Sequence, residues 1–275
     1  MTTDNNRERM ESIYRHLWSP GAAELLAQLD KSLNPRSSEM LYAIVKGLGI
    51  NRSQTVLDAG SGLGIYSCGL ASKFGCHVVG IDIAENNLEM ACARAKAERV
   101  DKLVTFQQGN IQSLPYEDAV FDLVWCRDML VHVHDLQQAF SGFARVLKPN
   151  GVALIHTTFA TNLMEHKEAI RLYESLGIVP ANMYSDYFED AFKAAGLQVH
   201  SSEPIGSEWL EYSEEQQARS SKELLHIARM RRLKGRIVAE FGQEAYDVIL
   251  AVDLWHLYLL IGKLSSTIYT LRKSS

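Results

Sequence analysis

The chain has 275 residues and a formal net charge of −5 at neutral pH, and it is long enough for one large α/β domain with an added cap. The excess of negative charge argues against a general nucleic-acid binder, which would present a basic surface. The polar residues 1–11 do not resemble a signal peptide. The cysteines have neither C-x-x-C nor zinc-site spacing, so we expect a reduced, cytoplasmic protein without a bound metal. They are Cys68, Cys76, Cys92 and Cys126.

The first informative element is an apolar strand predicted at residues 54–59, which runs into a turn with glycine at Gly60, Gly62 and Gly64. Glycine adopts positive φ and has no Cβ, so this backbone can turn sharply and bring its N–H groups against a bound molecule. A helix predicted at residues 65–74 would direct its N-terminus to the same place. The same pattern also occurs in ordinary tight turns, so it leaves both interpretations open.

A second apolar strand, at residues 77–82, ends in Asp82, eighteen residues after Gly64. In nucleotide-binding α/β units a carboxylate about 20 residues after the glycines accepts hydrogen bonds from ribose hydroxyls. A dinucleotide site requires G-x-G-x-x-G, which would need glycine where this chain has Ile65. The spacing G-x-G-x-G therefore favours a mononucleoside ligand. Alternatively, Asp82 caps the next helix.

The rest of the chain alternates strands and helices, as a parallel sheet requires. Further strands are predicted at residues 103–108, 121–126, 151–157, 197–202 and 266–272. Helices are predicted at residues 88–98, 136–147, 162–176 and 185–195, and over most of 207–264. Asn86 and Glu89 form a capping-box arrangement at the start of the helix at 88–98.

Five segments, taken together, resemble the class I S-adenosylmethionine-dependent methyltransferases. They are residues 56–64, 79–82, 109–116, 121–125 and the turn at 147–151 before the fifth strand. The likeness is greatest to the branch that methylates small molecules, including quinone, sarcosine, sugar and natural-product methyltransferases. It implies an α/β, Rossmann-like fold with a seven-stranded, mostly parallel sheet, an antiparallel last strand and helices on both faces.

The resemblance also implies S-adenosylmethionine as the cofactor, held beyond the carboxyl ends of the strands. The backbone of residues 58–64 would hold the methionine portion, Asp82 the ribose and Ile83 one face of adenine. Asn110 would meet the adenine amino group; many relatives have aspartate there, but the amide oxygen can accept the same hydrogen bond. The expected cofactor contacts are Asp58, Gly60, Ser61, Gly62, Gly64, Asp82, Ile83, Asn110, Ile111, Cys126 and Arg127.

The chemistry of methyl transfer requires the acceptor and the sulfonium to be held in line, and needs no covalent enzyme intermediate. A hydroxyl or an acidic carbon also benefits from a base, for which histidine is the natural candidate. His132 and His134 follow the predicted fourth strand, where a histidine could instead simply hold a loop, and His156 ends the predicted fifth strand. Arg127 could bind the cofactor carboxylate or an anionic acceptor, or form a surface ion pair with Asp128.

The acceptor is expected to contact segments outside the motif core. The candidate contacts are Tyr14, Trp18, Tyr184, Tyr187 and Trp209, each of which could instead be an ordinary packing residue. We expect an N-terminal helical lid at residues 1–34, a cofactor-binding core at 35–206 and 265–275, and a helical cap at 207–264.

The sequence leaves several functions open. We expect methyl transfer to oxygen, nitrogen or carbon of a small molecule in secondary or specialised metabolism, by a monomer or homodimer with no nucleic-acid or membrane partner. The basic run at 229–236 could attract a phosphorylated substrate or form a solvated helix face. The apolar run at 248–261 is shorter than the roughly 20 residues of a membrane helix. One alternative is a nucleic-acid or protein methyltransferase, but residues 125–128 at the end of the fourth strand do not have the motif of such enzymes. The other is a family member that binds the cofactor without methylating.

Overall fold

The computed structural model describes residues 3–273, with side chains from residue 6 onward. The chain divides into two compact units, Met1–Pro35 and Arg36–Ser275. The first unit contains α1 (Thr3–Leu17) and α2 (Pro20–Leu29). The side chain of Ser19 begins α2 by accepting a hydrogen bond of 3.1 Å from the Ala22 N–H, and Pro20 occupies the first turn, where its missing N–H has no cost.

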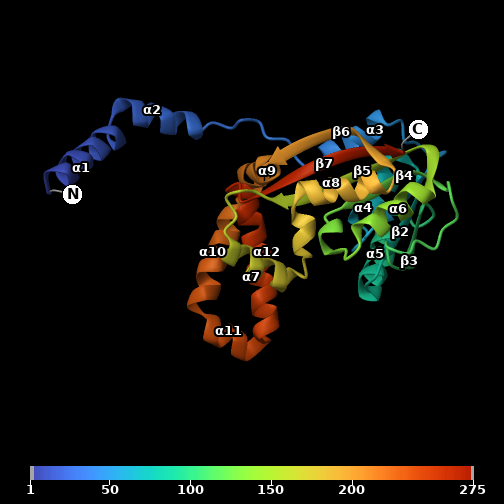
Figure 1. The fold of residues 1–275 in the computed structure, drawn as a ribbon. Helices are drawn as coiled ribbons and strands as arrows, with labels where there is room; N and C mark the ends of the chain where they lie inside the picture. The colour runs from blue at the N-terminus through green and yellow to red at the C-terminus, as the bar shows by residue number, and fades with distance from the viewer. Residues whose placement is uncertain (1–2, 274–275) are drawn as a thin grey trace. The chain divides into compact units, whose positions relative to one another are not determined.

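The second unit is built on one seven-stranded sheet (Figure 1). Its strands are β1 (Thr55–Ala59), β2 (His77–Asp82), β3 (Val104–Gln108), β4 (Phe121–Arg127), β5 (Leu147–Ala160), β6 (Leu197–Gly206) and β7 (Leu264–Lys273). They lie in the order β3-β2-β1-β4-β5-β7-β6. The pairs on the β3 side of β5 are parallel, whereas β7 runs antiparallel to both β5 and β6. The predicted fold class is therefore confirmed.

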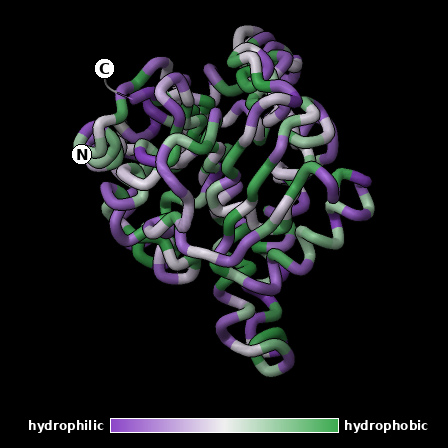
Figure 2. The backbone as a smooth tube through the Cα atoms, turned by 90° about the vertical axis from the view of Figure 1, so that its right-hand side faces the viewer, coloured by the Kyte–Doolittle hydropathy of each residue, from purple (hydrophilic) through white to green (hydrophobic). Residues whose placement is uncertain are grey.

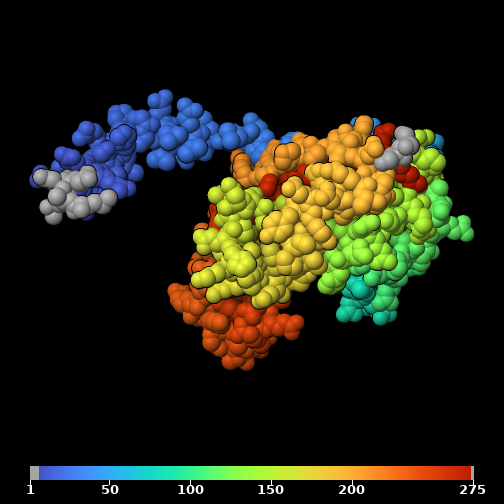
Figure 3. Space-filling model, viewed as in Figure 1, coloured from blue at the N-terminus to red at the C-terminus, as the bar shows by residue number. Residues whose placement is uncertain are grey.

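Helices connect these strands and form the cap. They are α3 (Met40–Gly47), α4 (Ile65–Phe74), α5 (Glu85–Ala97), α6 (Leu136–Val146), α7 (His166–Leu176), α8 (Ser185–Ala194), α9 (Glu208–Gln217), α10 (Arg219–Arg232), α11 (Lys234–Phe241) and α12 (Gln243–Leu260). Two short 3₁₀ turns are η1 (Leu130–His132) and η2 (Pro180–Met183). The α10–α12 segment extends away from the sheet in Figure 1, and its orange and red surface projects from the second unit in Figure 3.

The hydrophobic core lies on both faces of the sheet, because successive residues of a strand point in opposite directions. Val56 belongs to a cluster with Leu41 and Leu70 from α3 and α4. Its neighbour Leu57 belongs to the other cluster, with Phe140 of α6 and Phe188 of α8. Apolar stretches along the central strands are visible in Figure 2. Helices on both faces hold the carboxyl ends of the parallel strands at one edge.

Two local predictions were wrong. Helix α5 begins at Glu85 after Ala84, so Asn86 lies inside the helix and does not cap it. The reason is that Asp82 accepts a 2.9 Å hydrogen bond from the Ala84 N–H and allows the helix to start earlier. The turn expected at 147–151 belongs to β5, because Leu147 pairs with Phe121 before a register shift. Among residues 3–273, no helix combines the length and apolar character needed to cross a membrane.

Candidate active site

The glycine turn after β1 is held against β2 by backbone hydrogen bonds. Gly60, Gly62 and Gly64 have φ of 81°, 49° and 71°, which is the left-handed region that favours glycine. The N–H groups of Gly60 and Ser61 both donate to the Ile81 carbonyl, at 2.8 and 2.9 Å. The turn therefore has a fixed shape that other residue types would strain.

The two later glycines have different surroundings. A Cβ on Gly64 would lie 2.7 Å from Phe106 Cζ and 2.8 Å from Ala91 Cβ, so this glycine permits close packing between α4, α5 and β3. A Cβ on Gly62 would meet no protein atom within 4 Å. Beside it, the hydroxyl of Ser61 is buried and has no hydrogen-bond partner among the described residues. Gly62 therefore borders open space next to an unused hydrogen-bonding group.

Asp82 ends β2 beside this turn, and its side chain holds the local structure together. Its Oδ2 accepts a 2.8 Å hydrogen bond from the Gly62 N–H. Its Oδ1 accepts from the Ala84 N–H at 2.9 Å and from Asn87 Nδ2 at 3.3 Å. Asp82 thus fixes the turn and the residue before α5, although α5 has no side-chain cap. A carboxylate has about four acceptor positions, so one remains for a ligand.

The other expected cofactor contacts differ in accessibility. Ile83 is 64% exposed directly after Asp82, as a platform for a flat ring would be. Asn110 is exposed, and its Oδ1 accepts from the Gln112 N–H, which fixes the side chain. Ile111 is 4% exposed, and Cys126 is 1% exposed within the core. Any contact from Cys126 would therefore come from its backbone.

Asp58 is a buried carboxylate beneath the turn. Its side chain accepts a 2.5 Å hydrogen bond from Ser67 Oγ at the start of α4. Burial raises the pKa of Asp58 to about 7, with a further increase from the charge of Asp82 and a decrease from the Ser67 hydrogen bond. Asp58 therefore fixes α4 under the turn and does not itself face open space.

A cavity of about 410 Å³ lies between the carboxyl ends of β4 and β5 and the cap helices α9, α10 and α12. Its polar and aromatic lining includes Glu39, Tyr66, Arg127, Asp128, His156, Thr158, Trp209, Tyr212, Arg219, Trp255, His256 and Ser266. This volume is in the range of small-molecule sites, and the mixture of aromatic walls with a few polar groups is typical of them.

Asp128 joins two of the predicted site residues in this cavity. His156 Nδ1 lies 2.9 Å from Asp128 Oδ1, and Arg127 Nε donates to Asp128 Oδ2 at 3.1 Å. Partial burial alone would raise the pKa of Asp128, but the His156 ring and then the Arg127 guanidinium hold it at about 2. Asp128 adopts φ of 56°, outside the usual range for a non-glycine residue. The local backbone thus directs one carboxylate at both neighbours.

Aromatic rings enclose the same pair. The His156 ring stacks on Trp209 with centroids 4.6 Å apart, and the Arg127 guanidinium lies 4.4 Å from the Tyr66 ring centre and 5.3 Å from that of Trp209. His156 is 4% exposed, and within the described part of the chain neither of its ring nitrogens has a hydrogen bond of good geometry, although Nδ1 is close to Asp128. Of the predicted residues, the structure brings Arg127, His156 and Trp209 together.

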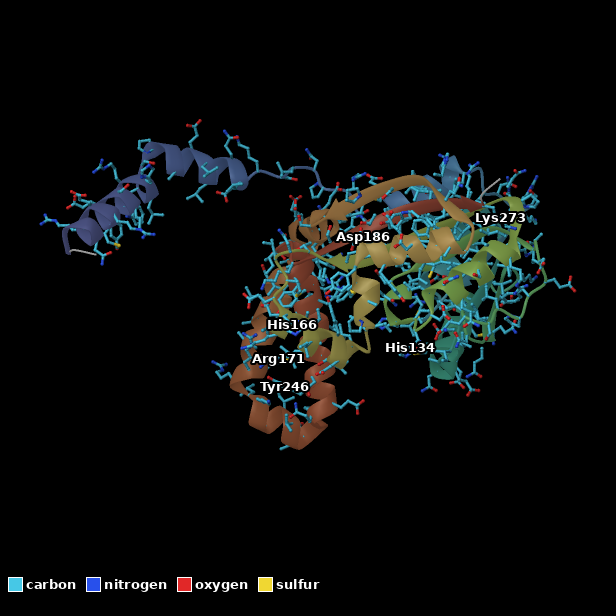
Figure 4. All side chains as sticks on the ribbon, in the orientation of Figure 1. His134, His166, Arg171, Asp186, Tyr246 and Lys273 are labelled. Carbon is cyan, nitrogen blue, oxygen red and sulfur yellow. The ribbon has the colours of Figure 1, made fainter. Side chains whose placement is uncertain are left out.

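The other two histidines lie elsewhere. His132 Nδ1 is 3.1 Å from the Gly177 carbonyl, and its ring lines a neighbouring cavity of about 270 Å³. His134 is exposed before α6, and in Figure 4 it lies well apart from the cap helix that carries Tyr246. The 410 Å³ cavity therefore contains one of the three candidate bases.

The expected acceptor contacts are mostly not brought together. Tyr184 and Tyr187, at the start of α8, are 64% and 46% exposed and do not line the cavity. Tyr14 and Trp18 belong to the first unit, so their predicted contact with an acceptor remains a prediction.

The sequence reasoning missed several lining residues. Nothing in the sequence marked Tyr66 as a cavity residue except its place in the helix after the glycine turn. Arg219 comes from α10, and its contact with His256 of α12 accompanies its place in the cavity lining. His256 did have a signal, because it interrupts the apolar run at 248–261.

Comparisons with known proteins agree with this arrangement. A family model described as a methyltransferase domain matches residues 57–155. The sterol 24-C-methyltransferase ERG6B of Gibberella zeae is 27% identical over 239 residues, which cover 82% of this chain and 63% of that protein. Alignments to the first four curated relatives span between 29% and 70% of their lengths, and three fall below two thirds.

Solved structures show the same fold. The [4+2]-cyclase SpnF has a TM-score of 0.68 at 18% identity, over 86% of this chain and 81% of that chain. A geranyl diphosphate methyltransferase in complex with SAM has a TM-score of 0.62 at 17% identity, over 86% and 85% of the two chains. Residues 57–155 are therefore similar to a methyltransferase domain, and the motifs and the sheet order agree with the fold of the class I S-adenosylmethionine-dependent methyltransferases.

Proposed function

We propose that this protein transfers the methyl group of S-adenosylmethionine to oxygen, nitrogen or carbon of a small organic acceptor bound in the 410 Å³ cavity. The observation that carries this proposal is the arrangement of the glycine turn, Asp82 and His156 at one edge of the sheet. In open α/β sheets this edge is where ligands bind.

The residues at the turn suit an adenosyl ligand. Open space beside Gly62 permits close approach to the backbone, and the unused hydroxyl of Ser61 can hydrogen-bond to a polar group. Asp82 has acceptor capacity left for a ribose hydroxyl, and the exposed Ile83 follows it. When bound there, S-adenosylmethionine would supply an electrophilic methyl group. Asn110, Ile111 and Cys126 complete the proposed set of cofactor contacts, and Arg127 lines the acceptor cavity.

Within the cavity, we assign His156 as the base. Neither ring nitrogen of His156 has a hydrogen bond of good geometry, but the Asp128 carboxylate lies 2.9 Å from Nδ1. Its negative charge favours the tautomer with the proton on Nδ1, which leaves Nε2 to take up the acceptor's proton. As the acceptor lone pair forms its bond to carbon, the carbon–sulfur bond breaks and S-adenosylhomocysteine leaves. Trp209 stacks on the His156 ring, which is only 4% exposed, so little water reaches this base.

A screen of small-molecule acceptors that measures S-adenosylhomocysteine release tests this function. We expect Asp82→Ala to raise the KM for S-adenosylmethionine at least about tenfold, because a hydrogen bond to a charged group contributes roughly 1.5–3 kcal/mol. His156→Asn should lower kcat by about a hundredfold for an acceptor that loses a proton. His134→Asn is the matched control and should behave like the wild type. No release with any acceptor, despite cofactor binding, would favour a non-methylating member of the family.

The cysteines bear on the cellular setting of the protein. We infer a role in specialised metabolism, as a cytoplasmic monomer or homodimer without a nucleic-acid or membrane partner. All four cysteines are free, three of them buried, which supports a reducing compartment. Analytical ultracentrifugation would determine the number of subunits.

A further inference from the structure

Two guanidinium groups line the 410 Å³ cavity. They come from separate elements, Arg127 from the end of β4 and Arg219 from the first turn of α10, and both are lining residues of the cavity. Arginine offers five N–H donors in a planar fork and stays charged at all relevant pH values. The N–H groups of Arg127 and Arg219 that have no partner in the protein therefore indicate which acceptor atoms a ligand must supply.

Arg127 has donors to spare. Its Nε donates to Asp128, and its two aromatic neighbours contact the faces of the guanidinium, where no hydrogen bonds form. Its Nη1 is buried and has no hydrogen-bond partner among the residues described. A buried donor without a partner costs roughly a lost hydrogen bond, so this nitrogen calls for an acceptor atom from a ligand.

Arg219 is held in place by two residues behind it. Its Nε donates to Glu223 Oε1 at 2.9 Å, and its Nη2 lies 3.1 Å from His256 Nε2. His256 Nδ1 lies 2.9 Å from the same Glu223 oxygen. Burial and then the charge of Arg219 lower the pKa of His256, so the ring is neutral and can accept from Arg219. These contacts use Nε and Nη2, and the side chain of Arg219 is 46% exposed, so its Nη1 is available to a ligand.

The two carboxylates that line the cavity already have cationic partners. Glu39 pairs with Lys73 at 2.8 Å, and Asp128 is shared between His156 and Arg127. Glu223 is 8% exposed and lies outside the lining; its Oε1 accepts from Arg219, and its buried Oε2 has no hydrogen-bond partner among the described residues. The lining itself therefore presents two guanidinium groups without a free carboxylate to meet them.

We infer that the acceptor carries an anionic oxygen group, a carboxylate or a phosphate, which binds Arg219 and the free edge of Arg127 while the nucleophilic atom faces His156. This inference rests on the proposed function to the extent that the cavity is the acceptor site. Arg219 acts as the specificity-determining residue, and Glu223 and His256 position its fork.

Calorimetric titration of the full chain with sodium benzoate and, separately, with inorganic phosphate tests the inference and distinguishes the two anion types. We expect saturable binding of one of them in the presence of S-adenosylhomocysteine. Arg219→Gln should weaken that binding at least about tenfold, the loss of one charge-assisted contact. Arg231→Gln, on the same helix but outside the cavity lining, is the matched control and should leave it unchanged.

Two results would overturn the inference: no saturable binding of either anion, or equal affinity in Arg219→Gln and the wild type. If Arg219→Gln does not fold, Arg219→Lys retains the charge without the fork and should bind the anion about threefold more weakly, whereas unchanged affinity would contradict the assignment. S-adenosylhomocysteine binding is measured in the same samples. If S-adenosylhomocysteine binds and neither anion does, this inference is refuted and the proposed function is not. If an anion binds and S-adenosylhomocysteine does not, the proposed function is refuted.

Discussion

Gly62 and Gly64 both have a left-handed backbone, but their surroundings differ. Substitution of Gly64 should therefore affect mainly stability, and substitution of Gly62 mainly ligand binding. An alanine at either position costs about 1–2 kcal/mol for its backbone. Gly64→Ala should cost about 1–3 kcal/mol more, because its Cβ would meet Phe106 and Ala91. Gly62→Ala should instead weaken S-adenosylhomocysteine binding at least about tenfold, since its methyl group enters the proposed cofactor space. Urea unfolding and calorimetry check both, and equal losses of stability would contradict the assignment.

Asp58 makes the stability depend on pH. Its pKa is about 7 in the folded chain and roughly 3.9 when unfolded, so between these values the folded state holds a proton that the unfolded state has lost. Stability therefore falls as pH rises through this window, by an amount on the order of a few kcal/mol.

Asp58→Asn should remove that dependence. Urea unfolding from about pH 4 to pH 7 should show the wild type losing stability relative to the variant. The exposed Asp101→Asn is the control and should follow the wild type. A constant difference between wild type and Asp58→Asn across this range would show that Asp58 titrates normally.

At the residue scale, sequence reasoning located the glycine turn and Asp82 because their roles depend on local spacing. It did not locate Asp128 as the residue that joins Arg127 and His156, because that role depends on an unusual backbone angle and on the neighbouring β5. Arg219 and His256 were missed as lining residues because the packing of α10 on α12 brings them to the cavity.

At the element scale, α9 is fixed by a charged contact to the start of the second unit. Arg36 donates through Nε and Nη2 to both carboxylate oxygens of Glu208, at 2.8 and 2.7 Å. Hydrogen bonding from Arg36 lowers the pKa of Glu208, so this stabilisation is present above pH about 4.3 and is lost as pH falls further. The contact holds the helix that carries Trp209 over His156.

Glu208→Gln should reduce the free energy of unfolding by about 1 kcal/mol near neutral pH, and by less at high salt. Urea unfolding at low and high NaCl measures both. Glu11→Gln breaks the exposed Arg7–Glu11 pair and should cost less than about 0.5 kcal/mol. If Glu208→Gln lowers the free energy of unfolding by no more than Glu11→Gln does, the Arg36–Glu208 contact does not hold α9 in place.

The elements themselves were mostly predictable, because their apolar periodicity is set by burial on the sheet. The errors came at their ends. The extra residues of β5 depend on pairing with β4, and the start of α5 depends on Asp82, so neither boundary is encoded in the segment itself.

At the scale of the whole molecule, both hydrophobic clusters draw their residues from Leu41 to Leu271. A chain without residues 1–34 should therefore keep a cooperative unfolding transition. If this segment is a lid, the shortened chain should bind S-adenosylhomocysteine severalfold more weakly. Thermal unfolding and calorimetry test the two statements separately, and unchanged affinity would refute the lid.

The overall topology was predictable from ordered motifs, but the acceptor cavity was not. Its walls come from strands and helices far apart in sequence, so only their packing defines its shape. This explains why Tyr184 and Tyr187, which are close in sequence to the cap, do not contribute to it.

The most direct measurement is a crystal structure of the full chain with S-adenosylhomocysteine. We predict the ribose at Asp82, the backbone of the glycine turn against the ligand, and the sulfur directed toward the cavity that contains His156. A nucleoside bound elsewhere, or a sulfur directed away from that cavity, would contradict the account.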